Sequence, residues 1–305
     1  MTAKLPFTVS APASSGNLGP GFDVLAMALS LRNTVQVRQG TGLVDVRGEG
    51  AGSLPTDATN LVARAFEQAA GTTIAAAGID LRCTNTIPPA RGLGSSTAAA
   101  ACGLVAGWEY LEQEWDEDEL FAALAVFDGH PDNAAACAHG GIVLCHDRPP
   151  VGDFPAELDV IPLGAADWIV PVAVIPDREL STEQSRGVLP GSYSRHEVVQ
   201  AIGAAGLLVG GLLGGAPELV ESALETDVVH EPHRAALVPE LAEARDAAHA
   251  GTEALGTTLS GAGPTVLVWS EQDGADQVVG AMAIEFPQAT VLPLTIDPHG
   301  ARLES

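Results

Sequence analysis

The stretch that decides the fold is Pro88-Pro89-Ala90-Arg91-Gly92-Leu93-Gly94-Ser95-Ser96, and an alanine-rich run from Thr97 to Tyr110 follows it directly. This run contains no proline and only two glycines, which predicts a helix. Gly92 and Gly94 allow the backbone to come close to a ligand, and N–H groups of the loop and the helix start can converge on phosphate oxygens. The stretch therefore predicts an anion-binding loop at a helix N-terminus, to which Arg91 adds positive charge.

The loop differs from two familiar nucleotide-binding signatures. It lacks the Gly-Lys-Ser/Thr of a Walker A loop, and the single lysine of the chain is Lys4. It also lacks the third glycine of a dinucleotide-binding fingerprint. From the residues alone, a capped helix after a tight turn explains the pattern as well as a phosphate site does. Ser96 suits either role, as a helix cap or as a ligand of Mg²⁺.

The composition is that of a globular chain with a large negative charge. Of the 305 residues, 46% are hydrophobic and 17% are charged, which argues against disorder. This length favours two domains of about 150 residues each. The formal net charge is −25, from 39 acidic and 14 basic residues. Nucleic acids and anionic membranes both require a basic face, so neither is expected as a partner.

The cysteines and one apolar stretch indicate the compartment. The cysteines form no CxxC pair and lie among apolar or small residues, which predicts buried free thiols: Cys83, Cys102, Cys137 and Cys145. The N-terminus shows no secretory segment, so a cytoplasmic protein is expected. The apolar stretch from Ala201 to Gly215 is too short to span a membrane and predicts a buried helix.

Alternation and turn residues indicate the order of the elements. Strands are expected over Phe7–Ala11, Thr34–Arg38, Leu43–Arg47, Ile79–Asn85, Gly140–Cys145, Trp168–Ile175 and within Thr257–Trp269, with a loop over Pro12–Gly21. Helices are expected over Asp57–Ala70, Thr97–Tyr110, about 118–127, and near 195–213, 217–226 and 239–250. The stretch Asp147–Pro155 is the best boundary and divides the chain into domains 1–150 and 151–305. Strands and helices without strict alternation favour an α+β fold.

Four segments together resemble one enzyme superfamily. The loop at 88–96 resembles the phosphate-binding motif of the GHMP kinases, which include galactokinase, homoserine kinase, mevalonate kinase and phosphomevalonate kinase. Ser14–Asp23 (SSGNLGPGFD) is similar to the first motif of the homoserine kinases, and Leu259–Thr265 (LSGAGPT) is similar to the third. Gly129–Asn133 (GHPDN) resembles a homoserine kinase signature. Because the segments follow the family's order along the chain, the chain is identified as a member of this superfamily.

The resemblance implies a fold and a reaction. It implies an N-terminal domain that carries the ATP loop, a C-terminal ferredoxin-like domain, and an active site between the two. It implies transfer of the γ-phosphoryl group of ATP to the side-chain hydroxyl of L-homoserine, a step of threonine biosynthesis, with Mg²⁺ as cofactor. Such a transfer mainly requires positioning and charge neutralisation, and no catalytic base is implied for this branch.

The substrate residues follow from the same resemblance. They are Asn17, Asp23, His130, Asn133, Thr182, Arg186 and Arg234. A carboxylate at Asp23 suits the ammonium group of an amino acid, and two guanidinium groups suit its carboxylate and the transferring phosphate. From the residues alone, Asn17 and Asp23 fit an Asx turn as well, and the arginines fit a solvated surface. His130 also fits a structural role in a turn.

The nucleotide residues form a second group. They are Asn60, Pro88, Arg91, Gly92, Leu93, Gly94, Ser95, Ser96, Gly261 and Gly263. Asn60 resembles the adenine-side residue of the family, and it also suits the N-cap of the helix that follows it. Mg²⁺ is implied at Ser96.

The chain departs from the homoserine kinase pattern at two places. The family usually carries a glutamate four residues before the histidine of the GHPDN segment, as a partner of the loop serine at Mg²⁺. Val126 stands there, and valine cannot ligate a hard cation, so Asp128 is the candidate replacement. The segment Val199–Gly203 lacks the Phe-Asn and following Arg that the family often shows. The substrate-side wall of the second domain can therefore differ.

The departures leave three interpretations open. The first is a working homoserine kinase with an altered metal site. The others are a paralogue that phosphorylates a related amino alcohol, and a catalytically impaired relative that binds ATP or an amino acid. Mevalonate-type transfer fits less well, because the GHPDN segment indicates the homoserine branch. The expected partners are a small-molecule substrate and a second copy in a homodimer.

Overall fold

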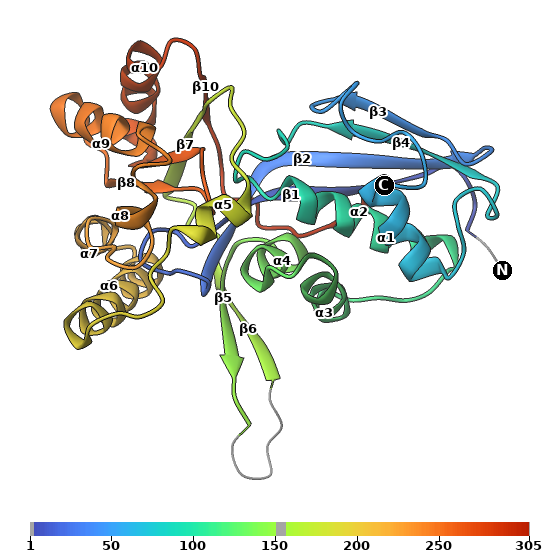
Figure 1. Ribbon diagram of the computed structural model, residues 1–305, viewed down its shortest axis with the longest axis horizontal. Helices are drawn as coiled ribbons and strands as arrows, with labels where there is room; N and C mark the ends of the chain where they lie inside the picture. Colours follow the sequence, from blue (N-terminus) through green and yellow to red (C-terminus); the bar gives the residue numbers. More distant parts are fainter. Residues whose placement is uncertain (1–2, 151–156, 305) are drawn as a thin grey trace.

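The computed structural model describes residues 3–150 and 157–304, whose strands form two sheets (Figure 1). The larger sheet contains β1 (Phe7–Gly16), β2 (Leu25–Gln39), β3 (Val44–Gly48), β4 (Ile79–Asn85), β5 (Ile142–Arg148), β6 (Glu157–Gly164) and β11 (Arg302–Glu304). The smaller sheet contains β7 (Ile169–Ile175), β8 (Gly256–Leu259), β9 (Val266–Glu271) and β10 (Thr290–Pro293). The α+β class is confirmed.

The larger sheet is organised around the long strand β2. The order of its main path is β11-β1-β2-β4-β3, and β5 pairs with the first part of β2 and carries β6. These neighbours are antiparallel except for β3 and β4, which are parallel. The smaller sheet has the antiparallel order β10-β7-β9-β8. Both sheets therefore bring together strands that are distant in sequence.

Helices cover one face of the larger sheet and surround the smaller one (Figure 1). The larger sheet is covered by α1 (Leu61–Ala70), α2 (Ser95–Tyr110), α3 (Glu117–Asp128) and α4 (Pro131–His139). The second domain holds α5 (Thr182–Gly187), α6 (Arg195–Gly214), α7 (Pro217–Leu224), α8 (Glu231–Arg234), the 3₁₀ turn Gln272–Gly274, α9 (Glu240–Gly251) and α10 (Ala275–Glu285). The expected helices are present within a few residues, whereas α4, α5, α8 and α10 were not predicted.

Close packing between α1 and α2 fixes the loop that precedes α2. A Cβ added at Gly103 would lie 2.4 Å from the carbonyl oxygen of Val62, and one at Gly107 would lie 2.9 Å from that of Phe66. Glycine destabilises a helix by about 1 kcal/mol relative to alanine. At these two positions the close contact between the helices outweighs that loss. The N-terminus of α2 is thereby held against the rest of the domain.

Strand β1 runs further than the sequence predicts. We expected a loop from Pro12 to Gly21, but residues 13–16 remain paired with residues 26–29 of β2. The register shifts between Pro12 and Ala13, where the proline cannot donate to the ladder, and pairing then resumes. The long partner strand thus outweighs the local turn composition. The first motif begins on this strand and becomes a loop only after Gly16.

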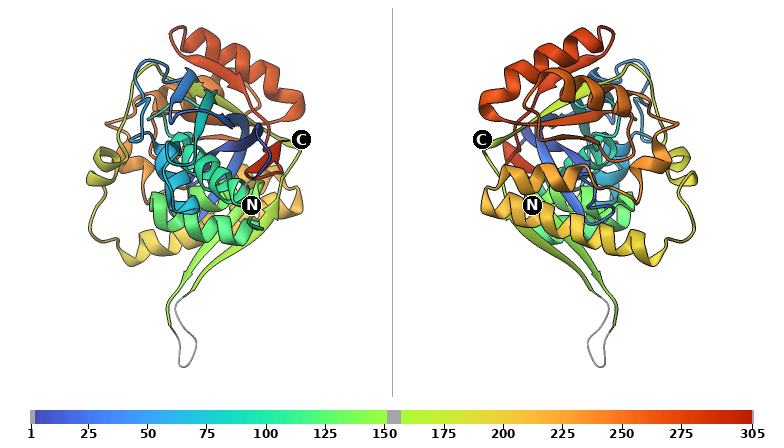
Figure 2. Two further views of the ribbon diagram at one scale, coloured as in Figure 1. Left: turned by 90° about the vertical axis from the view of Figure 1, so that its right-hand side faces the viewer. Right: turned by 90° about the vertical axis from the view of Figure 1, so that its left-hand side faces the viewer.

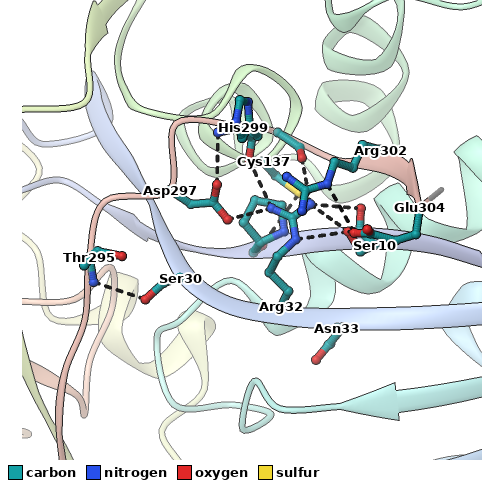
Figure 3. A network of polar contacts seen from close by, with 12 residues as sticks. Ser10, Ser30, Arg32, Asn33, Cys137, Thr295, Asp297, His299, Arg302 and Glu304 are labelled. Carbon is teal, nitrogen blue, oxygen red and sulfur yellow. Dashed lines mark hydrogen bonds and ion pairs between the residues drawn. The ribbon is translucent and has the colours of Figure 1, made fainter. Parts of the chain in front are cut away.

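The last residues of the chain return to the first domain (Figure 3). Arg32 on β2 donates to the carboxylate of Asp297 at 2.6 Å, and to the carbonyl oxygens of His299 and Gly300 at 3.1 and 2.8 Å. Its Nε also donates to the hydroxyl of Ser10 at 3.0 Å. The side chains of Arg32 and Asp297 are 14% and 11% exposed, so this ion pair is largely shielded from water. It secures the segment that leads to β11.

The strands on either side of the predicted domain boundary both belong to the larger sheet. The expected boundary, Asp147–Pro155, lies partly in residues 151–156, which are outside the described residues. β5 and β6 lie on either side of it and pair with each other, extending away from both domains (Figures 1 and 2). The chain enters the smaller sheet only after Gly164, and β11 belongs to the larger sheet.

Helix α6 has nearly the predicted bounds but is more exposed than predicted. We expected a helix near 195–213 with its apolar stretch 201–215 buried, whereas α6 spans Arg195–Gly214 and buries only Ala204, Leu208, Gly211 and Leu212. This narrow stripe packs on α7, while Val199, Ile202 and Leu213 are 62%, 68% and 61% exposed. By length and composition α6 is long and apolar enough to cross a membrane, and 22% of its apolar 18-residue stretch is buried.

Candidate active site

A pocket of about 450 Å³ lies between the two domains. It is lined by all the predicted site residues except Pro88, whose place is taken by its neighbour Pro89. From the larger-sheet domain these are Asn17, Asp23, Asn60, Arg91, Gly92, Leu93, Gly94, Ser95, Ser96, Asp128, His130 and Asn133. From the second domain they are Thr182, Arg186, Arg234, Gly261 and Gly263. The fold therefore gathers one cluster from segments far apart in sequence.

Backbone hydrogen bonds join the three motif loops at the floor of the pocket. The N–H of Ser14 donates to the carbonyl oxygen of Leu93 at 3.1 Å. The N–H of Gly261 donates to the carbonyl oxygen of Gly16 at 3.1 Å, and the hydroxyl of Ser260 donates to that of Gly92 at 2.7 Å. Each loop is thus held by another loop rather than by solvent.

Gly92 and Gly94 are required by this close packing. Their φ angles are +79° and +65°, in the left-handed region that favours glycine. An added Cβ at Gly92 would lie 2.3 Å from the carbonyl oxygen of Ser260, and one at Gly94 would lie 2.0 Å from the hydroxyl oxygen of Ser14. The two glycines therefore permit both the turn and the contact between motifs.

The N-terminus of α2 points its N–H groups at the pocket. Gly94 is the N-cap residue, and among the described residues no side chain caps this helix end. Ser95 does not supply a cap, because its hydroxyl donates to the carbonyl oxygen of Ile87 at 3.2 Å. Unsatisfied N–H groups and the positive end of the helix dipole favour an anion here.

A carboxylate lies beside the first turn of α2. Asp128 accepts a hydrogen bond from the Thr97 hydroxyl, and its Oδ2 lies 3.6 Å from Nδ1 of His130. Burial raises the pKa of the Asp128 carboxyl, but the neighbouring His130, Thr97 and Ser96 outweigh burial and lower the pKa. The hydrogen bond to Asp128 correspondingly raises the pKa of His130. An ionised carboxylate and the Ser96 hydroxyl are oxygen donors of the kind that Mg²⁺ prefers.

Arg91 is held at the edge of the pocket by backbone carbonyls. Its Nε donates to the carbonyl oxygen of Pro176 at 3.1 Å and its Nη1 to that of Pro89 at 3.0 Å. The exposed carboxylates of Asp177 and Glu179 lie 3.7 and 3.4 Å from it. In this arrangement Arg91 ties the phosphate loop to the second domain rather than reaching over the N-terminus of α2.

Asn60 adopts the N-cap role that the sequence left open. Its Oδ1 accepts from the N–H of Val62 at 2.9 Å, and its Nδ2 donates to the carbonyl oxygen of Pro55 at 2.7 Å. The side chain is 5% exposed and lines a mainly apolar end of the pocket, together with Val46, Leu54, Leu61 and Cys83. A flat aromatic group such as a nucleobase suits walls of this kind.

An ion pair crosses the opposite end of the pocket. Asp23 lies 2.8 and 3.1 Å from Nη2 and Nη1 of Arg186, in a bidentate arrangement. The Asp23 loop is set by Asn17, whose Oδ1 accepts from the N–H of Asp23 at 3.1 Å and whose Nδ2 donates to Gly261 at 2.8 Å. The bond to Asp23 spans six residues, so Asn17 forms a longer-range support of the pocket wall instead of the local Asx turn that the sequence also allowed. Asp23 and Arg186 are 42% and 44% exposed, so a ligand can reach both.

Arg234 is buried behind Arg186. It is 2% exposed, its Nε donates to the carbonyl oxygen of Ser185 at 3.2 Å, and its Nη1 donates to that of Gly261 at 3.2 Å. Within the described residues its Nη2 has no hydrogen-bond acceptor. Burial, followed by the charge of Arg186, lowers the pKa of Arg234. Two guanidinium groups held this close attract an anion.

Residues 58–141 match the GHMP kinases N terminal domain, and residues 205–288 match the GHMP kinases C terminal. The homoserine kinase of Deinococcus radiodurans is 41% identical over 281 residues, covering 88% of this chain and 86% of that protein. The homoserine kinase of Mycolicibacterium smegmatis is 40% identical and covers 99% of this chain and 96% of its own length. The chain belongs to the homoserine kinase family.

Solved structures agree with this assignment. The crystal structure of homoserine kinase from Cytophaga hutchinsonii superposes with a TM-score of 0.85 at 28% identity, covering 100% of this chain and 99% of that chain. A crystal structure of mevalonate kinase superposes with a TM-score of 0.71 at 12% identity, covering 95% and 99%, and shows a shared fold. As a homoserine kinase family member, the protein is a phosphotransferase that acts on a hydroxyl group, with ATP as co-substrate.

Neither departure from the homoserine kinase pattern affects the pocket. Asp128 lines the pocket, and α3 turns by about 200° over the two residues that separate Asp128 from Val126. Val126 therefore faces solvent and is 83% exposed. The acidic position beside Ser96 is therefore Asp128, and the importance we attached to Val126 is corrected. Val199 and Ile202 lie on the exposed side of α6, and no residue of 199–203 is among the described residues that line the pocket.

Sequence reasoning missed several residues of the site. Phe22 lies between the two arginines, with its ring centroid 5.9 Å from the Arg186 guanidinium and 5.5 Å from that of Arg234. Asp132 is 5% exposed, and its one hydrogen-bond partner among the described residues is Asn133 at 3.3 Å. Burial raises the pKa of Asp132. Phe22 and Asp132 lie inside the segments 14–23 and 129–133, in which only neighbouring residues were predicted to bind the substrate.

Proposed function

We propose that the protein transfers the γ-phosphoryl group of ATP to the side-chain hydroxyl of L-homoserine and forms O-phosphohomoserine for threonine biosynthesis. The observation that carries this proposal is the placement of Asp23 opposite Arg186 and Arg234, beside an uncapped helix N-terminus. A carboxylate facing two guanidinium groups complements the ammonium and carboxylate groups of an α-amino acid. The high similarity to homoserine kinases over nearly the whole chain supports the same substrate.

The nucleotide would lie along the wall formed by the loop at 91–96. Its phosphates would accept from the N–H groups of the loop and of the first turn of α2. Its base would enter the mainly apolar end of the pocket near Asn60. This placement leaves the γ-phosphoryl group directed at the amino-acid end.

Asp128 and Ser96 would hold Mg²⁺. The carboxylate and the hydroxyl lie together at the start of α2, where the lowered pKa keeps Asp128 ionised. When bound, the ion would neutralise phosphate charge during transfer.

The amino acid would replace the ion pair that crosses the pocket. Its ammonium group would take the place of the Arg186 guanidinium against Asp23, and its carboxylate would bind Arg186 and the free Nη2 of Arg234. Asn133 and His130 lie on the wall between this end and α2, where they can orient the substrate hydroxyl. The work of the protein is then positioning and charge balance.

Release of ADP tests this proposal with a panel of acceptors. Purified protein with Mg-ATP should release ADP rapidly with homoserine, and slowly or not at all with threonine, serine or mevalonate. Turnover with another amino alcohol alone would make the protein a paralogue. ATP binding without turnover would contradict the kinase proposal and leave a binding protein. The exposed position of Val126 removes the main argument for that last alternative.

We also propose that the protein forms a homodimer and is cytoplasmic. The exposed apolar side of α6 offers a surface that a second copy can cover. Sedimentation velocity on the wild type and on Ile202→Glu tests it: a dimer that dissociates in the variant supports this surface, and a monomeric wild type contradicts it.

A further inference from the structure

A buried histidine joins the two walls of the substrate end. His230 precedes α8 and is fully buried. Its Nε2 lies 2.9 Å from the carbonyl oxygen of Gly19, in the loop of the first motif. Its Nδ1 lies 3.0 Å from Nη1 of Arg234. One imidazole ring therefore contacts both a larger-sheet loop and a guanidinium group of the second domain.

The partners of His230 define its protonation state. The Arg234 guanidinium can only donate, so Nδ1 must accept and carries no proton. The Gly19 carbonyl can only accept, so Nε2 must carry the proton and donate. The ring is therefore a neutral imidazole of one tautomer. Burial lowers the pKa of His230 to about 4; the charge of Asp227 opposes this shift, and the charge of Arg234 acts in the same direction as burial.

His230 also forms part of the wall beneath the two arginines. Its ring lies 5.2 Å from the ring of Phe22, tilted by 31°. Phe22 in turn lies against both Arg186 and Arg234. The histidine therefore supports Arg234 directly through Nδ1 and supports Phe22 through packing.

Two acidic residues lie beside His230, and Oδ2 of Asp227 is 3.5 Å from its Nε2, but their hydrogen bonds are made mainly to other groups. Asp227 accepts from the backbone N–H groups of Val229 and Glu231, both at 2.8 Å. Glu231 accepts from the N–H of Leu259 at 2.7 Å and from Arg245 at 3.1 Å. Although Asp227, His230 and Glu231 lie close enough together to suggest a metal site, their polar atoms bind protein donors and acceptors. The group is a hydrogen-bonded support for α8.

We propose that His230 is a positioning residue of the substrate end: its Nδ1 fixes Arg234 so that Nη2 faces the pocket, and its Nε2–H fixes the Gly19 carbonyl. Two backbone carbonyl oxygens, those of Ser185 and Gly261, also accept from Arg234 and leave its side chain little freedom. The same ring sets the distance between the 17–23 loop and the second domain. The expected effect rests on the proposed function, because Arg234 is assigned there to the substrate carboxylate.

The kinetic test uses three substitutions that separate the contributions of the ring. His230→Phe keeps an aromatic ring but removes both nitrogens. His230→Asn can replace the acceptor at Nδ1, and His230→Gln can replace the donor at Nε2. We expect His230→Phe to raise KM for homoserine about tenfold or more and to change KM for ATP less than about twofold. Partial rescue by Asn or Gln shows that the hydrogen bonds matter.

A double substitution distinguishes positioning from general destabilisation. If His230 acts through Arg234, His230→Phe should have little further effect on homoserine KM in an Arg234→Ala background. Equal effects in both backgrounds would contradict the proposal, as would a parallel rise in KM for ATP. Thermal unfolding of each variant in the presence of ATP identifies any variant that fails to fold.

A measurement independent of turnover keeps this inference separate from the proposed function. The ¹⁵N chemical shifts of His230 in the wild type should report the neutral Nε2–H tautomer at pH 7. Hydrogen exchange of residues 17–23 should become faster in His230→Phe. A charged ring, the opposite tautomer, or unchanged exchange would contradict the positioning role. If the tautomer and the faster exchange are observed but homoserine is not phosphorylated, only the proposed substrate is overturned.

Discussion

The Asp23 carboxylate and the Arg186 guanidinium form a bidentate ion pair, with distances of 2.8 and 3.1 Å, that joins the two domains across the mouth of the pocket. Each partner is more than 40% exposed, so the pair contributes little to stability. The ion pair instead places a negative and a positive group where the ammonium and carboxylate groups of a zwitterion can bind them. The pair therefore presents the two charges that complement the carboxylate and ammonium groups of an amino acid.

Asp23→Asn should weaken amino-acid binding selectively. The variant keeps the shape of the side chain but loses the charge that the ammonium group requires. We expect KM for homoserine to rise at least about tenfold, in line with about 1.5–3 kcal/mol for a charge-assisted hydrogen bond, with KM for ATP nearly unchanged. Steady-state kinetics with each substrate varied in turn provide the measurement. An unchanged homoserine KM would contradict the assignment of Asp23.

Asp128→Ala should reduce activity and raise the Mg²⁺ concentration needed for half-maximal rate. Loss of the carboxylate beside Ser96 should lower the rate about 10- to 100-fold at fixed Mg²⁺. Val126→Ala is the matched control, because Val126 lies two residues away on the same helix and faces solvent. Titration of Mg²⁺ against initial rate measures both. Equal losses in the two variants would show that α3 rather than the carboxylate is responsible.

Gly94→Ala should disrupt the phosphate loop. The added methyl group would meet the Ser14 hydroxyl oxygen at 2.0 Å in a residue with φ of +65°. Gly71→Ala is the control, because Gly71 has φ of +64° and open space around it. The control should lose only the left-handed preference, about 1 kcal/mol, and keep ATP affinity. Thermal unfolding and ATP titration separate the two effects, and a Gly94→Ala variant with normal ATP binding would contradict the tight-loop account.

Asp80 should make folding stability depend on acid. Its Oδ1 accepts from the N–H groups of Thr41, Gly42 and Leu43 at 2.8–3.1 Å, and these bonds lower the pKa of Asp80. A lowered pKa stabilises the fold above the unfolded value of 3.8, and this stabilisation is lost as pH falls through the folded value.

Asp80→Asn should therefore have a free energy of unfolding about 1 kcal/mol below that of the wild type at pH 7, and should unfold at a lower temperature. This difference in stability should shrink below pH 3.8. Asp246→Asn, which removes the same charge from an exposed position, provides the control. Thermal melts of the three proteins from pH 3 to pH 7 make the comparison. A difference that grows as the pH falls would contradict the assignment.

The sequence predicted the parts of the fold that depend on local chemistry. Gly92 and Gly94 identify the phosphate loop because few residues other than glycine accept their conformations and contacts. The strand at Ile79–Asn85 was predicted with its observed bounds, since its alternation and flanking turns are local. Nearly all the site residues that were predicted from the motifs line the pocket, whereas its apolar residues such as Val46 and Leu54 were not predicted.

Non-local pairing explains what the sequence did not predict. The return of the C-terminal segment depends on Arg32, which contacts residues more than 260 positions away. The role of Asp128 depends on where α3 ends: Gly129, with φ of +74°, terminates the helix directly after it. The position of His230 beside Gly19 follows from the assembly of two domains, so no spacing along the chain could indicate it.

Identification of the product tests the central claim most directly. The purified protein would be incubated with Mg-ATP and an equimolar mixture of homoserine, threonine and serine, and the products followed by ³¹P NMR and mass spectrometry. We expect O-phosphohomoserine as the main phosphorylated amino acid, formed in step with ADP, and loss of this product in Asp23→Asn. A mixture without phosphohomoserine, whether another amino acid is phosphorylated or none, would contradict it.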